Sequence, residues 1–175
     1  MKMKCWTLAS TVNYDHAFNS NEWFILISIA IGYSLLFILP KRFPTTYTFL
    51  FLFIGMNSGM VFDHTISIPP FDFYDVNDSS KFELFDFFSY IMYGPYGYFF
   101  FYIYDYLKLR RYRTMVYIII WSITAMIVER VASNLGVFHY KAGYKFIYSF
   151  PFYFYVQSVT LVLFTFIMKK APPNK

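Results

Sequence analysis

Glu129 is the residue with the clearest chemical significance, because it lies inside an apolar run, residues 115–137, that is long enough to cross a lipid bilayer. A carboxylate at that depth costs about 2.5–3.5 kcal/mol on insertion scales. Such a group is expected to be paired, to face other parts of the protein or to lie near water. Any functional interpretation therefore starts from Glu129.

Other ionisable residues are predicted to gather at the same depth as Glu129. Asp63 and His64 close one apolar run, Asp86 opens the next, and His139 follows the run that holds Glu129. The candidate functional cluster comprises Asp63, His64, Asp86, Glu129, Arg130, His139, Tyr140 and Lys141.

Three interpretations of this cluster are open. The carboxylates and imidazoles are groups that bind divalent metals, and they are also groups that relay protons or act as acid and base. The third interpretation is a structural polar cap, in which Glu129 is paired with Arg130, Lys141 or a tyrosine hydroxyl. Glu129 and Arg130 are adjacent on a helix and point about 100° apart, so they are poor partners for each other. No spacing matches a signature such as H-E-x-x-H, so we assign no catalytic residue, metal or cofactor.

The elements that must position these groups are membrane helices. Hydrophobic residues make up 58% of the 175-residue chain and charged residues 14%, against about 25% charged in soluble domains. The pattern predicts an all-α integral membrane helical bundle with about five transmembrane helices, in a single membrane domain over residues 1–175. The predicted spans are 23–39, 45–62, 87–107, 114–137 and 146–168, with a polar, aromatic-rich loop over residues 63–86.

The positive charges indicate orientation rather than nucleic-acid binding, because they cluster in short loops between apolar blocks. One side of the predicted bundle carries nine Lys and Arg residues: Lys41, Arg42, Lys108, Arg110, Arg111, Arg113, Lys169, Lys170 and Lys175. The other side carries six: Lys2, Lys4, Lys81, Arg130, Lys141 and Lys145. We therefore expect a multi-pass plasma-membrane protein with its N-terminus outside and its C-terminus in the cytoplasm. Cys5 is the single cysteine, so no internal disulfide can form.

Small residues predict which helix faces meet. Gly55, Gly59 and Asp63 are spaced by four and share a face, which is typical of close helix packing and, as the alternative, of a site. Glu129 shares a stripe with small and polar residues, so it should point into the bundle; the stripe is Ser122, Ala125, Ala132, Ser133 and Gly136. Pro95 predicts a kink in the third span, which either opens a cavity or fits a curved bundle.

The stretch over residues 129–152, ERVASNLGVFHYKAGYKFIYSFPF, resembles a family of uncharacterised small multi-spanning membrane proteins of spore-forming Gram-positive bacteria. In that family a membrane glutamate precedes a Tyr-Lys-x-Gly-Trp element and an aromatic last span. The matching residues are Glu129, Tyr140, Lys141 and Gly143, while Tyr144 stands where the family has Trp. The resemblance implies a bacterial plasma-membrane helical bundle and no established activity.

Two functions are compatible with these features. The first is a non-enzymatic accessory or sensor subunit that acts through its outer polar face, with the lipid bilayer, a membrane-protein partner or a second copy as partners and no nucleic acid. The alternative is a membrane-embedded enzyme or carrier for a lipid-like or small polar substrate that uses Glu129. Whether the chain is an enzyme is open, and its small size favours a non-enzymatic role.

Two observations would separate these functions. A buried Asp63, Glu129 and His139 cluster that opens to a cavity would favour the enzyme or carrier. If Glu129 instead has a buried counter-charge, Glu129→Gln should fold poorly, because breaking a buried ion pair costs about 3–5 kcal/mol.

Overall fold

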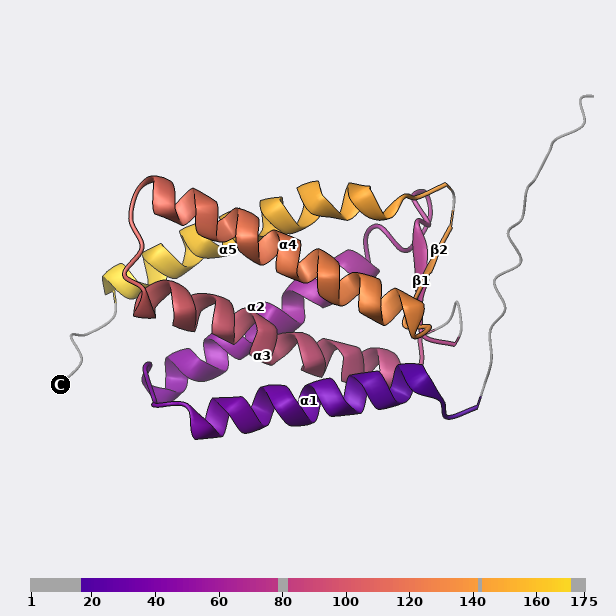
Figure 1. Cartoon of the computed structure of the whole chain (residues 1–175), viewed down its shortest axis with the longest axis horizontal. Coiled ribbons are helices and arrows are strands. Elements are labelled where there is room, and N and C mark those ends of the chain that lie inside the picture. The colour runs from indigo at the N-terminus through magenta and orange to yellow at the C-terminus, as the bar shows by residue number, and fades with distance from the viewer. Residues whose placement is uncertain (1–16, 79–81, 142, 171–175) are drawn as a thin grey trace, which may run out of the picture.

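The chain forms five long helices and a small two-stranded sheet (Figure 1). The computed structural model describes residues 17–78, 82–141 and 143–170. In chain order the elements are α1 (Ser20–Ile38), α2 (Thr45–Asp63), β1 (Tyr74–Val76), α3 (Leu84–Tyr106), α4 (Tyr112–Asn134), β2 (Phe138–Tyr140), the 3-10 turn η1 (Phe146–Tyr148) and α5 (Ser149–Lys170). The prediction of an all-α bundle is confirmed.

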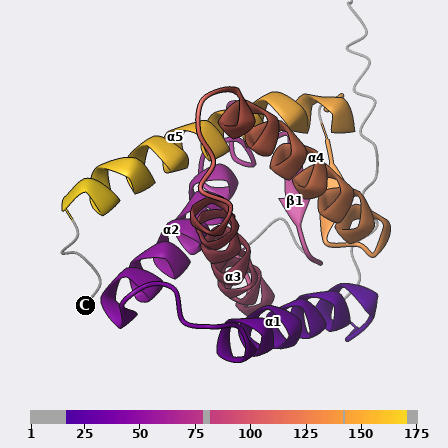
Figure 2. The same cartoon turned by 60° about the vertical axis from the view of Figure 1, so that its left-hand side comes forward.

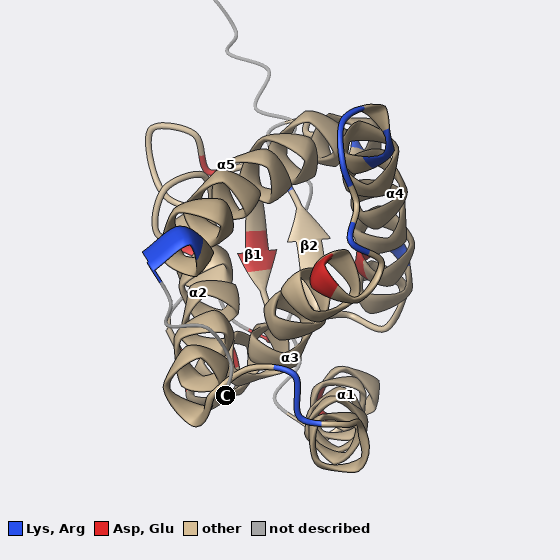
Figure 3. Ribbon diagram, turned by 90° about the vertical axis from the view of Figure 1, so that its left-hand side faces the viewer, with Lys and Arg blue, Asp and Glu red and all other residues tan. Residues whose placement is uncertain are grey.

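All five helices run between the same two ends of the molecule (Figure 1). β1 and β2 lie at one end, here called the strand end. The α1–α2 and α3–α4 connections and the end of α5 lie at the other, the basic end (Figure 3). The described Lys and Arg residues of the basic end are Lys41, Arg42, Lys108, Arg110, Arg111, Arg113, Lys169 and Lys170. Four lysines of the orientation count, Lys2, Lys4, Lys81 and Lys175, lie outside the described residues, as does Cys5.

Four of the described helical segments are long and apolar enough to cross a membrane: Ser20–Ile38, Thr45–Asp63, Tyr112–Asn134 and Phe146–Lys170. Large apolar side chains on their outer faces are exposed, such as Phe37 at 82% and Phe53 at 62%, and such faces fit a lipid bilayer. Helix α3 has 23 residues and is therefore about 34 Å long. It is not among these four candidate spans, and it lies among α1, α2 and α4 (Figure 2).

Glycine allows α2 and α3 to pack at close range. A Cβ atom on Gly55 would lie 2.5 Å from the backbone oxygen of Tyr93 and 3.1 Å from the Cα atom of Gly97. A Cβ atom on Gly59 would collide with the ring of Tyr93. Both glycines therefore face α3, and the backbones touch because neither residue carries a side chain.

Pro95 interrupts the hydrogen bonds of α3, and α1 compensates for this loss. Proline has no N–H group, so the carbonyl group of Ile91, four residues earlier, loses its donor within the helix. The Tyr33 hydroxyl of α1 donates to that carbonyl oxygen at 3.4 Å. Gly32 lies directly against the Pro95 ring, which brings Tyr33 within reach.

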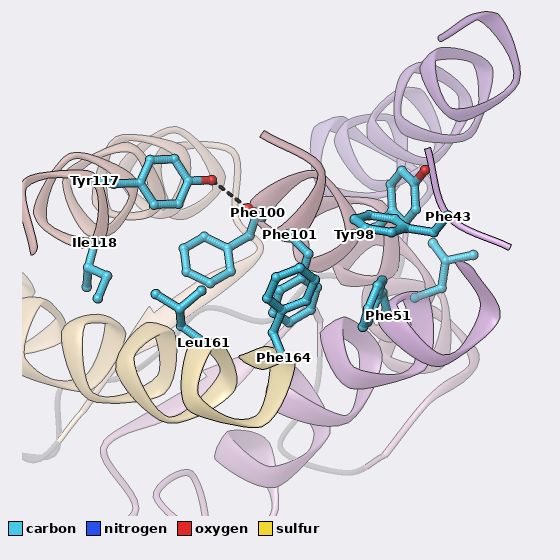
Figure 4. Close-up of a cluster of buried hydrophobic side chains, with 10 residues drawn as sticks. Phe43, Phe51, Tyr98, Phe100, Phe101, Tyr117, Ile118, Leu161 and Phe164 are labelled. Carbon is cyan, nitrogen blue, oxygen red and sulfur yellow. Dashed lines mark hydrogen bonds between the residues drawn. The ribbon is translucent and has the colours of Figure 1, made fainter. Parts of the chain in front are cut away.

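An aromatic core fills the bundle between the cavity described below and the basic end (Figure 4). The rings of Phe101 in α3 and Phe164 in α5 stack with their centroids 5.1 Å apart. The Tyr117 hydroxyl of α4 donates to the backbone oxygen of Phe100 at 2.6 Å. These contacts hold α3, α4 and α5 together, since each buried ring contributes a large apolar area.

The strand end differs in detail from the sequence-based prediction. Residues 63–86, expected to be a loop at the membrane interface, contain β1, which pairs antiparallel with β2. Helix α4 ends at Asn134 instead of residue 137, because Gly136 adopts φ 88° and the chain turns back towards β2. Residues 146–148 form a 3-10 turn before α5, which starts at Ser149.

Candidate functional site

Glu129 is buried near the strand end of α4, and its partners are hydroxyl groups. Its Oε1 atom accepts hydrogen bonds from Tyr140 at 2.6 Å and from Ser149 at 2.7 Å. Tyr144 in turn lies 3.1 Å from Ser149. The Oε2 atom is buried and accepts no hydrogen bond among the described residues. The sequence left three partners open for Glu129: Arg130, Lys141 or a tyrosine hydroxyl. The structure shows the tyrosine hydroxyl.

Asp63 has a closely similar environment at the last residue of α2. Its Oδ1 atom accepts a hydrogen bond from the Tyr74 hydroxyl at 2.8 Å. Its Oδ2 atom is buried and, within the described part of the chain, accepts none. Asp63 and Glu129 are each only 7% exposed. Two buried carboxylates therefore each have one oxygen bound to tyrosine and one oxygen without a hydrogen-bond donor.

The small sheet positions both tyrosines. Tyr74 and Tyr140 are directly opposite each other in the register of β1 and β2, and side chains of such a pair lie on one face of a sheet. Burial, together with Glu129, raises the pKa of Tyr140 well above its ordinary value. Burial, together with Asp63, does the same to the pKa of Tyr74. Both hydroxyls therefore keep their protons and act as hydrogen-bond donors to the carboxylates.

A cavity of about 380 Å³ is lined by residues of all five helices and both strands, and both carboxylates line it. Its walls are mainly Phe, Tyr, Gly, Ala and Val side chains, and its polar groups other than the carboxylates include Tyr93, Tyr153, Ser149 and Gln157. Pockets for small molecules have volumes of about 300–1,000 Å³ and combine apolar walls with a few polar groups. The arrangement can therefore enclose one small, largely apolar molecule next to two carboxylates.

Two of the predicted site residues lie beside the cavity but do not line it. Asp86 accepts hydrogen bonds from the Asn77 amide at 2.7 Å and from the Glu83 backbone at 2.7 Å. Its Oδ2 atom thus caps α3, and its Oδ1 atom binds the Asn77 side chain that follows β1. His64 is exposed at the end of α2, with Phe82 and Tyr90 as ring neighbours. These residues stabilise the strand end.

The remaining predicted residues point away from Glu129. Arg130 is exposed and lies over the Phe146 ring. Lys141 makes ion pairs with Asp75 at 2.6 Å and Asp72 at 3.2 Å. His139 alternates with Tyr140 along β2 and lines a second, smaller hollow on the other face of the strand. The predicted cluster therefore divides, and only Asp63, Glu129 and Tyr140 meet at the cavity.

Several residues of the site were not predicted from the sequence. Tyr74 was interpreted as an interfacial aromatic of the loop, and Tyr93 was not singled out. Ser149, Tyr153 and Gln157 lie in the predicted last span, and nothing in the sequence identified them as neighbours of Glu129. Among the described residues, no group of three or more His, Cys, Asp or Glu side chains is placed to hold a metal ion.

A scan against protein-family models and searches of curated proteins and solved structures return no match to this chain.

Proposed function

We propose that the protein is a non-enzymatic, membrane-embedded ligand-binding protein, a sensor or a carrier, whose cavity takes a small molecule with a large apolar part. The observation that supports this function is the cavity itself, which combines apolar and aromatic walls with two buried carboxylates that each lack one hydrogen-bond donor. Of the three residues whose buried cluster at a cavity would favour an enzyme or carrier, Asp63 and Glu129 line this cavity and His139 does not. The family resemblance and a bacterial plasma-membrane location belong to the same proposal.

Blocking the cavity should abolish ligand binding. Val156 lines the cavity, whereas Val159, on the same helix, is 48% exposed and does not. Val156→Trp should prevent binding of phenyltrimethylammonium and tert-butylbenzene, and Val159→Trp should bind them as the unmodified protein does. Binding is measured as the rise in the thermal unfolding midpoint of the purified protein with increasing probe concentration. If neither probe stabilises the unmodified protein, or if the two variants behave alike, the cavity is not a ligand site.

An enzyme that uses Glu129 as base is the second candidate, because the Ser149 hydroxyl donates to Glu129 at 2.7 Å on the cavity wall. A serine next to a base can act as a nucleophile. Ser149→Ala separates the two functions. A binding protein should keep most of its probe affinity in this variant, whereas an enzyme of this type should lose its turnover.

The proposed orientation can be tested at two matched positions. Lys145 at the strand end and Arg110 at the basic end are both exposed. In a Cys5→Ser background, Lys145→Cys should react with a membrane-impermeant thiol reagent added outside intact cells, and Arg110→Cys should react only after permeabilisation. Each substitution removes one positive charge, so the comparison is balanced. Labelling of Arg110→Cys alone from outside would reverse the orientation.

A further inference from the structure

The ionisable groups of the cavity wall are acidic and not basic. Among the described residues that line it, two are acidic, Asp63 and Glu129, and none is Lys, Arg or His. The nearest basic groups are engaged elsewhere: Lys141 is paired with Asp72 and Asp75, and Arg130 is exposed. An ionised carboxylate in an apolar environment is strongly unfavourable unless a cation or a proton compensates it. Among the described residues, no Lys, Arg or His side chain lines the cavity to compensate Asp63 or Glu129.

One oxygen of each carboxylate lacks a hydrogen-bond donor among the described residues, and this is where a bound ligand can supply the compensating positive charge. Asp63 Oδ2 and Glu129 Oε2 accept no hydrogen bond among the described residues, although both residues are more than nine-tenths buried and the hydroxyls of Tyr90 and Tyr153 interact with Asp63 and Glu129, respectively. Buried polar atoms in native proteins almost always have partners, so an exception calls for an explanation. The tyrosine hydroxyls donate hydrogen bonds to the other two oxygens but carry no positive charge. They therefore do not compensate the negative charge of the carboxylates.

We propose that the ligand is an organic monocation, a protonated amine or a quaternary ammonium with an apolar body, held beside Asp63 and Glu129. This inference rests on the proposed function, because it names the ligand class of the same cavity. The tyrosine and phenylalanine rings of the wall suit such a cation, since aromatic faces attract ammonium groups. A divalent metal ion is disfavoured, because no group of three or more His, Cys, Asp or Glu side chains among the described residues is placed to hold one.

A pair of isosteric probes tests the ligand class. Phenyltrimethylammonium and tert-butylbenzene have nearly the same shape, and only the first carries a charge. We expect the purified protein to bind the cation roughly tenfold or more tightly. Glu129→Gln and Asp63→Asn should each remove most of the charge preference. Asp86→Asn, which removes a buried carboxylate outside the cavity, should retain it.

Each result has a distinct meaning. If tert-butylbenzene binds as tightly as the cation, or if the charge preference survives in both cavity variants, the cation proposal is overturned while the cavity remains a ligand site. If neither probe binds, the proposed function fails together with this inference.

Discussion

Gly55→Ala should strongly destabilise the protein. The added Cβ atom would lie 2.5 Å from the Tyr93 backbone oxygen and 2.9 Å from that of Gly94. Backbone atoms cannot rotate away as side chains can, so α2 and α3 must separate along their shared face. Overpacking of this kind typically costs about 1–3 kcal/mol, and Gly55→Leu should prevent recovery of folded protein.

The matched substitutions for this prediction are Gly59→Ala and Phe53→Leu. The atoms nearest to a Cβ atom on Gly59 all belong to the ring of Tyr93. A side chain can move more easily than backbone, so Gly59→Ala should lower the free energy of unfolding less than Gly55→Ala. Phe53 is 62% exposed on the outer face of α2, and Phe53→Leu should change the unfolding midpoint very little. The measurement is thermal unfolding in detergent, followed by size-exclusion chromatography. Equal tolerance of Gly55→Ala and Phe53→Leu would contradict the observed helix packing.

Glu129→Gln should fold normally and lose cation binding. The glutamine oxygen can accept the two hydrogen bonds from Tyr140 and Ser149, so the local contacts are kept. Because the partners are hydroxyls and not a buried cation, no charge is left unpaired when the carboxylate is removed. A carboxylate in a membrane span costs about 2.5–3.5 kcal/mol to insert. Its removal should therefore leave the free energy of unfolding unchanged or higher. We expect affinity for phenyltrimethylammonium to fall roughly tenfold or more.

The control for this prediction is Glu129→Ala. Alanine accepts no hydrogen bond, so the buried hydroxyls of Tyr140 and Ser149 lose their acceptor, at a cost of about 1–3 kcal/mol for each unsatisfied group. The Glu129→Gln variant should therefore be more stable than the Glu129→Ala variant. If Glu129→Gln unfolds as readily as Glu129→Ala, the charge itself supports the fold, and the role of Glu129 is structural.

The apolar blocks predicted the helices well, because a segment that crosses about 30 Å of hydrocarbon requires roughly twenty apolar residues and leaves a strong pattern. The face of α4 was also predictable, since Ser122, Ala125 and Ala132 are buried together with Glu129. Small residues at helical spacing identify such a face without knowledge of the partner helix.

The tyrosines of the site could not be selected from the sequence. The chain contains 18 Tyr and 24 Phe residues, so the residue type alone does not show which hydroxyls point into the bundle. The strands that place Tyr74 opposite Tyr140 are three residues long, which is too short for an alternating pattern. The direction of side chains in these short strands was not predictable, which is why His139 was grouped with Tyr140 although the two lie on opposite faces of β2.

The central claim is that one cavity holds a cation between Asp63 and Glu129. The most direct measurement is a crystal structure of the protein with phenyltrimethylarsonium, the arsenic isostere of phenyltrimethylammonium, at a concentration that saturates binding in solution. Anomalous scattering then locates the arsenic atom. We predict a peak inside the cavity, beside Glu129 Oε2 and Asp63 Oδ2. A peak on the outer surface of the bundle, or an unoccupied cavity at saturation, would contradict the claim.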